Sequence, residues 1–144
     1  MTNKFYKKAI ITGINGQDGY YLSKYLIDLN YEVIGIGNTN FNTIHKSVNV
    51  ENCDLSSKIS IKKLINKFQP DEFYHLAAHH FSNENEIDNQ NNKRFIEVNF
   101  LQTKNIIELI LNYKKDCKFL FCGSSHMFSS KKKEQLIDTL RHFM

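Results

Sequence analysis

The strongest constraint on the fold is a run of three glycines that follows a short apolar segment. Gly13, Gly16 and Gly19 are spaced G-x-x-G-x-x-G between the apolar residues 9–11 and an amphipathic segment that begins at Gln17. Glycines let a chain turn sharply and approach a phosphate without a Cβ in the way. The free N–H groups and the dipole of the following helix favour negative charge. The sequence predicts a strand, a tight turn and a helix that bind a pyrophosphate; the alternative is an ordinary glycine-rich loop.

Hydrophobic spacing predicts that strands and helices alternate along the rest of the chain. Strands are predicted over residues 7–11, 31–36, 48–50, 72–76 and 118–122, and helices over residues 17–29, 56 or 57 to 68, and 95–113. Asn30 is a candidate left-handed cap, and Pro70 ends the second helix. Polar residues predict loops over 37–46 and 82–93, the second exposed and mobile.

This alternation indicates an α/β fold with right-handed crossovers between parallel strands. We expect a Rossmann-type parallel sheet of order 3-2-1-4-5, flanked by helices and ending after the fifth strand. In such sheets the ligand crevice lies where the strand order reverses, which places it beside Gly13.

The composition excludes several other classes of protein. The 144 residues suffice for one domain, and 41% of them are hydrophobic, without an apolar run long enough to cross a membrane. The net charge is only +4, and no basic stripe carries aromatic residues, which argues against nucleic-acid binding. The start of the chain has no signal-peptide pattern. Three cysteines without metal-ligand spacing predict a reduced, cytoplasmic setting; they are Cys53, Cys117 and Cys122.

Several short motifs occur in an order that resembles one known family. They are Thr12-Gly13-Ile14-Asn15-Gly16-Gln17-Asp18-Gly19, Cys53-Asp54-Leu55-Ser56, Tyr74-His75-Leu76-Ala77-Ala78, Val98-Asn99 and Phe121-Cys122-Gly123-Ser124-Ser125-His126-Met127-Phe128. Through them the chain resembles the extended short-chain dehydrogenase/reductase family from about Lys7 to Phe128. Within that family it is most similar to GDP-mannose 4,6-dehydratases and related nucleotide-sugar epimerases and dehydratases. The resemblance implies the NAD(P)-binding part of such an enzyme.

The resemblance also implies which residues hold the dinucleotide. Asp54 and Leu55 resemble a pair that contacts adenine through a carboxylate and a backbone N–H; the alternative for Asp54 is a helix cap. Asn38 stands where an acid would hold the ribose of NAD or an arginine the 2′-phosphate of NADP. Either cofactor is possible, and the missing acid leans to NADP. The expected contacts are Gly13, Asn15, Gly16, Gln17, Asp18, Gly19, Asn38, Asp54, Leu55, Leu76, Ala77, Ala78 and His79.

Two residues match catalytic positions of the family. Ser124 stands where a serine or threonine hydrogen-bonds the hexose O4; the alternative is a serine that caps a turn. His126 stands where a dehydratase has its glutamate base, which puts dehydration in doubt. Histidine can act as a base near neutral pH; the alternative is that His126 has no catalytic role. The family's Tyr-x-x-x-Lys pair has no match after Phe128. We therefore expect no turnover; the alternative is a non-catalytic dinucleotide-binding or oligomerising module.

Three histidines gather near the end of the fourth predicted strand. His75, His79 and His80 suggest a metal, but no Asp, Glu or Cys stands at ligand spacing from them. We predict a loop that lines the cofactor crevice, and no metal.

The end of the chain differs from the family. We expect residues 1–128 to form the NAD(P)-binding domain and residues 129–144 a divergent tail, with an amphipathic helix over 132–143. A frameshift, a gene truncation or a designed sequence would each give such a tail. The predicted fifth strand would leave an apolar edge uncovered, which favours association. A dinucleotide, a nucleotide sugar and further copies of the chain are therefore the expected partners.

Overall fold

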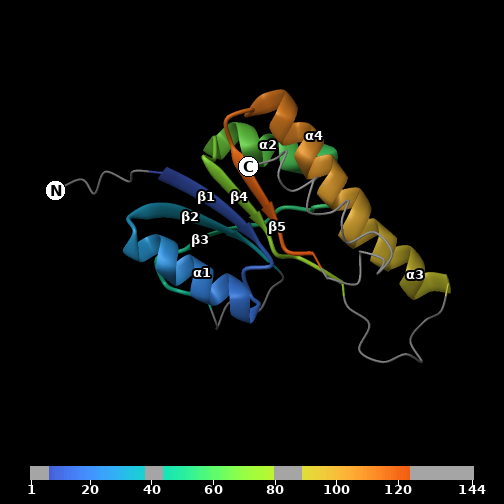
Figure 1. Cartoon of the computed structure of the whole chain (residues 1–144), viewed down its shortest axis with the longest axis horizontal. Helices are drawn as coiled ribbons and strands as arrows, with labels where there is room; N and C mark the ends of the chain where they lie inside the picture. The colour runs from blue at the N-terminus through green and yellow to red at the C-terminus, as the bar shows by residue number, and fades with distance from the viewer. Residues whose placement is uncertain (1–6, 38–43, 80–88, 124–144) are drawn as a thin grey trace, which may run out of the picture.

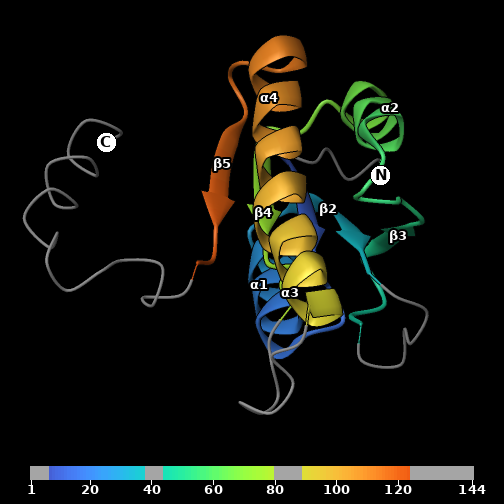
Figure 2. The same cartoon turned by 90° about the vertical axis from the view of Figure 1, so that its right-hand side faces the viewer.

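The fold is a five-stranded parallel sheet with helices on both faces. The computed structural model describes residues 7–37, 44–79 and 89–123. The sheet order is β3-β2-β1-β4-β5, as predicted. Figure 1 shows the sheet with its helices, and Figure 2 shows β3 and β5 at opposite edges. The strands are β1 (Lys7–Thr12), β2 (Tyr31–Ile36), β3 (Asn49–Glu51), β4 (Glu72–His75) and β5 (Lys118–Phe121), and the first helices are α1 (Gln17–Asp28) and α2 (Lys58–Phe68).

Alternation along β1 separates two hydrophobic layers. Ala9 and Ile11 point to α1, while Ile10 points to the layer formed with α2 and α4 (Thr103–Tyr113). Neighbouring residues of a strand face opposite sides of its sheet, so a strand buried on both faces reads as a continuous apolar run. All three side chains have no exposed surface. The run Ala9–Ile11 is thus the centre of a three-layer core.

The helix boundaries follow the capping residues of the sequence. The Ser57 hydroxyl accepts a hydrogen bond from the Ser60 N–H at 3.3 Å, which caps α2. Gln69 ends α2 with φ of 48°, and Asn30 follows α1 with φ of 64°, both in the left-handed region. Helix α1 differs, because its N-cap Gly16 has no side chain to satisfy the first N–H groups. The start of α1 is therefore open to a ligand.

The long helix predicted over residues 95–113 has three parts and begins earlier. Helix α3 (Asn89–Ile96) leads into a π-helical segment, η3 (Glu97–Gln102), which continues into α4. The loop predicted over 82–93 is wrong for residues 89–93, which are helical; residues 82–88 lie outside the described part. Three of the residues 89–93 are Asn, a weak helix former. Extending an existing helix costs less free energy than nucleating one, so residues 89–93 can continue the helix that the following residues form.

Strand β5 is the last described element and forms one edge of the sheet. Its Leu120 side chain is 46% exposed, and Leu111 of α4 is 57% exposed. In the described ranges no helix is long and apolar enough to span a membrane.

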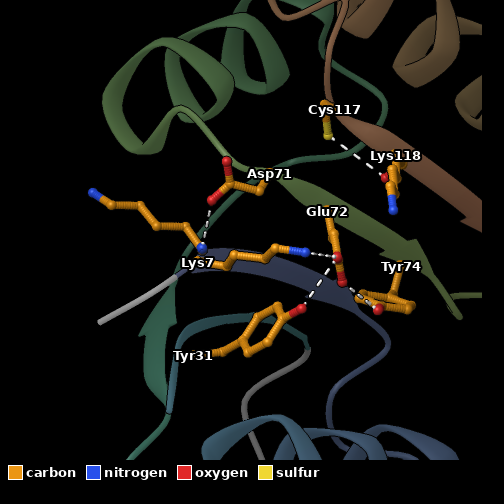
Figure 3. A network of polar contacts seen from close by, with 8 residues as sticks. Lys7, Tyr31, Asp71, Glu72, Tyr74, Cys117 and Lys118 are labelled. Atoms are coloured by element: carbon orange, nitrogen blue, oxygen red, sulfur yellow. Dashed lines mark hydrogen bonds and ion pairs between the residues drawn. The ribbon is translucent and has the colours of Figure 1, made fainter. Parts of the chain in front are cut away.

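A buried carboxylate joins three strands at the end of the sheet opposite the glycine turn. Glu72 accepts hydrogen bonds from Lys7 Nζ at 3.2 Å, the Tyr31 hydroxyl at 3.1 Å and the Tyr74 hydroxyl at 2.6 Å. Figure 3 shows these groups converging on the carboxylate. Glu72 itself is only 8% exposed. The network fixes the start of β4 against β1 and β2.

Candidate cofactor-binding site

The turn after β1 requires glycine at Gly13. Its φ is +73°, and a Cβ there would lie 2.8 Å from the Ala77 nitrogen. The Gly13 N–H donates to the Ile36 carbonyl oxygen at 2.8 Å. Gly13 therefore brings the ends of β1, β2 and β4 together, and any larger residue would separate them.

The next two glycines have different surroundings. Gly19 is buried in α1, and a Cβ on it would lie 2.7 Å from the Gly13 carbonyl oxygen and from Ile14 Cα. Gly16 is exposed, and among the described residues a Cβ on it would meet only the Gly13 oxygen, at 3.3 Å. Gly19 lets the helix approach the turn, whereas Gly16 keeps the outer side of the turn open. This cradle, beside the uncapped start of α1, fits the pyrophosphate of a dinucleotide.

A cavity of about 620 Å³ lies beside this turn, at the carboxyl ends of the strands. The cavity lies where the strand order reverses, between the β1–β2 side and the β4–β5 side of the sheet, as the strand order predicts. It is lined by Gly13, Asn15, Gly16, Ile36, Gly37, Asn52, Cys53, Asp54, Leu55, Leu76, Ala77, Ala78, His79, Arg94, Val98 and Gln102.

The structure brings nine of the thirteen expected cofactor contacts to this cavity. They are Gly13, Asn15, Gly16, Asp54, Leu55, Leu76, Ala77, Ala78 and His79. Gln17, Asp18 and Gly19 lie in the first turn of α1 beside it and do not line it. Asn38, Ser124 and His126 lie outside the described residues.

His75 does not line the cavity, so the predicted role of His75 in a crevice loop is wrong. It belongs to β4, is fully buried, and its Nδ1 lies 2.7 Å from the Thr12 hydroxyl. The Ala77 N–H donates to the same hydroxyl at 3.2 Å. Burial lowers the pKa of His75 to about 4, so the ring is neutral at pH 7. Through the Thr12 hydroxyl it is linked to Ala77, which lines the cavity. His79 does line the cavity, and His80 lies outside the described residues.

Asn99 of η3 fastens the cavity wall to the helix. Its Oδ1 accepts from the His79 N–H at 2.8 Å, and its Nδ2 donates to the His79 carbonyl oxygen at 2.9 Å. One amide side chain thus satisfies both backbone groups of a residue that follows β4. This contact positions η3, and with it Val98, over the cavity.

The Asp54 carboxylate accepts two hydrogen bonds from the same residue, Ser56. Its Oδ1 accepts from the Ser56 N–H at 2.9 Å and from the Ser56 hydroxyl at 2.7 Å, which lowers the pKa of the carboxyl. The carboxylate therefore stabilises the turn before α2 while Asp54 also lines the cavity. The helix cap is Ser57 instead.

Sequence reasoning missed the contribution of the helix to the cavity. Arg94, Val98 and Gln102 all line it, at spacings of four residues. The four-residue spacing is visible in the sequence, but the helix predicted after the loop over 82–93 began only at residue 95 and so left out Arg94. Cys53 was also missed; burial raises the pKa of its thiol to about 11, so it is not a nucleophile at neutral pH. No metal-binding group of His, Cys, Asp or Glu occurs in the described segments.

Residues 9–142 match the model of the NAD dependent epimerase/dehydratase family, a match that extends beyond Phe128, where the recognisable motifs end. Over 139 residues the chain is 30% identical to the GDP-mannose 4,6-dehydratase of Vibrio cholerae, covering 85% of this chain and 36% of the relative. It is 39% identical over 87 residues to GDP-mannose 4,6 dehydratase 1 of Arabidopsis thaliana, covering 50% of this chain and 24% of the relative. The chain thus spans about a third or less of the length of these relatives.

Solved structures share the fold. An epimerase of Methanothermobacter thermautotrophicus superimposes with a TM-score of 0.69 at 24% identity, covering 84% of this chain and 36% of that one. A short-chain dehydrogenase/reductase of Vibrio parahaemolyticus gives a TM-score of 0.72 at 19% identity, covering 92% and 73%. Strand order, glycine turn and family match agree, and they show that this chain belongs to the NAD dependent epimerase/dehydratase family.

Proposed function

We propose that this chain is the NAD(P)-binding portion of a nucleotide-sugar dehydratase or epimerase similar to GDP-mannose 4,6-dehydratase. The observation that carries the proposal is the cavity at the strand ends, closed on one side by a glycine turn that only a Cβ-free backbone can form. The similarity to GDP-mannose 4,6-dehydratases supports the sugar class. In an enzyme of this kind a hydride passes from the hexose C4 to nicotinamide and later returns.

The chain as written is proposed to be inactive by itself. Residues 129–144 hold no tyrosine, and no Tyr-x-x-x-Lys pair follows Phe128. Ser124 and His126 stay predicted contributors to the reaction. Incubation with GDP-mannose and NADP tests this part of the proposal, because turnover would contradict it. A cytoplasmic location also stays a prediction, supported by the three free cysteines.

Binding of NAD and NADP by isothermal titration calorimetry tests the proposed function directly. We expect weak binding, with Kd near the millimolar range or roughly −4 kcal/mol, which is what contacts to the adenosine half and the pyrophosphate alone would give. Both dinucleotides should compete for one site. A submicromolar Kd would contradict the expected weakness, and no binding of either dinucleotide would overturn the function.

Self-association is a second proposed property, favoured by exposed apolar side chains on η3, α4 and β5. Phe100, Leu111 and Leu120 are 60%, 57% and 46% exposed. Uncovered apolar surface favours association by roughly 25 cal/mol per Å². We expect a dimer or larger assembly by light scattering, and a changed state or aggregation after removal of residues 132–144. A monomeric mass at high concentration for both chains would refute it.

A further inference from the structure

Three side chains form one row across the carboxyl ends of the central strands. Thr12 of β1 pairs with His75 of β4, which pairs in turn with Phe121 of β5, and Figure 1 shows these strands side by side. Thr12 and His75 have no exposed surface. The His75 ring stacks on Phe121, with 5.7 Å between the ring centroids. His75 is thus a polar residue in an apolar place, and the next residue, Leu76, already lines the cavity.

One nitrogen of the His75 ring has a partner, and the other has none among the described residues. The Nδ1 atom lies 2.7 Å from the Thr12 hydroxyl, whereas the buried Nε2 atom makes no hydrogen bond. Burial alone lowers the pKa of His75 to about 4, so at pH 7 the ring carries a single proton. This proton lies on either Nδ1 or Nε2.

The partners of Thr12 decide between the two nitrogens. The Thr12 oxygen accepts the Ala77 N–H at 3.2 Å, and the other partner of the hydroxyl within the described chain is His75. If the hydroxyl donates to Nδ1, only the proton on Nε2 lacks an acceptor. If Nδ1 carried the proton, the Thr12 proton and Nε2 would both lack partners. Each unpaired buried group costs free energy, so the first arrangement is favoured.

This chain of hydrogen bonds ends in the wall of the cavity. The Leu76 N–H donates to the Thr12 carbonyl oxygen at 3.2 Å, and the following N–H, that of Ala77, is held by the Thr12 hydroxyl. Ala77 lines the cavity, and its nitrogen would lie only 2.8 Å from a Cβ on Gly13. A shift of the Ala77 backbone would therefore change the space between the wall and the glycine turn.

We propose that His75 is a positioning residue for the dinucleotide, because by accepting the Thr12 proton it turns the hydroxyl oxygen toward the Ala77 N–H and sets the wall against the glycine turn. The inference rests on the proposed function, since it assumes that the cavity takes a dinucleotide. It also accounts for a polar ring in an apolar row. Leucine at this position would avoid the unpaired Nε2–H, but it could not accept the Thr12 proton.

The test compares two replacements of His75, of which only one can accept a hydrogen bond. Asparagine offers its Oδ1 near the position of Nδ1, whereas leucine has no acceptor. In NMR titrations of the full chain with NAD and NADP, His75→Leu should weaken binding by ~3-fold or more, and His75→Asn should stay within about two-fold of wild type. Solvent exchange of the Ala77 amide proton should accelerate in His75→Leu alone.

A double-mutant cycle tests whether His75 acts through Thr12. Thr12→Val removes the hydroxyl, so adding His75→Leu to it should cause no further loss of affinity. Phe73→Leu is the control for general destabilisation. Phe73 is fully buried two residues earlier on the same face of β4 and does not line the cavity, so its replacement should lower the melting temperature without changing the Kd.

The outcomes separate this inference from the proposed function. An unchanged Kd in His75→Leu, an equal loss in His75→Asn, or additive losses in the double variant would overturn the role of His75 while dinucleotide binding stands. A ring proton on Nδ1 in long-range ¹H–¹⁵N spectra of wild type would also overturn it. If wild type binds neither NAD nor NADP, the proposed function fails and the inference fails with it.

Discussion

Replacing Gly16 with valine is expected to abolish dinucleotide binding and to leave the fold intact. The position already has extended backbone, with φ of −75° and ψ of 165°, which valine adopts without strain. Its Cβ would meet a single described atom, the Gly13 oxygen at 3.3 Å, so the branched side chain points into the open side of the turn. That is where a pyrophosphate would approach the N–H groups of α1. Calorimetry with NAD and NADP measures the loss, and the helix start should lose only about 1 kcal/mol.

Gly19→Val is the matched control, because it places the same side chain three residues further on. There the Cβ would lie 2.7 Å from backbone atoms of Gly13 and Ile14, which cannot move aside as a flexible side chain can. This variant should lower the free energy of unfolding by ~1–3 kcal/mol or more. Unchanged NAD(P) affinity in Gly16→Val would show that the turn is not the binding site.

Replacing Glu72 with glutamine is expected to destabilise the protein at pH 7 by ~1–3 kcal/mol, since three donors would lose their ionised acceptor in a buried place. Burial pulls the pKa of Glu72 upward. The hydrogen bonds from Tyr74, Lys7 and Tyr31 outweigh burial, and the pKa lies below the ordinary value. The carboxylate is thus the form that the fold stabilises.

The sign of the pH dependence follows from that shift. A lowered pKa in the folded state contributes stability that is complete above the unfolded pKa of about 4.3 and is lost as the pH falls through the folded value. The difference in free energy of unfolding between wild type and Glu72→Gln, measured by urea denaturation, should therefore disappear below about pH 4. Glu108→Gln serves as the control. This carboxylate pairs with Lys58 at the surface, so its replacement should change the free energy of unfolding little. A gap that stays constant or widens in acid would contradict the role of the Glu72 network.

Much of the fold could be predicted because its signals are local. The apolar run 9–11 marks a strand buried on both faces, and Ser57, Gln69 and Asn30 stand where helices begin or end. The strand order then follows from the handedness of the crossovers and needs no knowledge of side-chain contacts. The glycine spacing located the cavity for the same reason, since Gly13 has a backbone conformation, and Gly19 close contacts, that a larger residue does not tolerate.

The rest depends on contacts between residues far apart in the sequence. His75 stands beside His79 in the motif, yet the pleat turns its ring toward Phe119 and Phe121 and away from the cavity. Glu72 begins an apolar strand, and only the pairing of β1, β2 and β4 reveals its three donors. No periodicity within one segment encodes such partners. Arg94 was missed because the Asn-rich residues before it carry little helix signal.

The wider turn of η3 also sets the phase between the two helices that it joins. A regular α-helix advances by about 100° per residue, so one residue accommodated in a π turn rotates everything before it relative to everything after it. This offset lets Ile106 and Ile110 of α4 face the sheet while Arg94 of α3 faces the cavity. Regular α-helical winding of the same sequence over 97–102 would turn Arg94 from the cavity by about a quarter of a revolution, whereas deleting one residue there would restore regular winding and keep Arg94 in place. The winding of this segment, as well as its composition, thus determines which side chains a ligand meets.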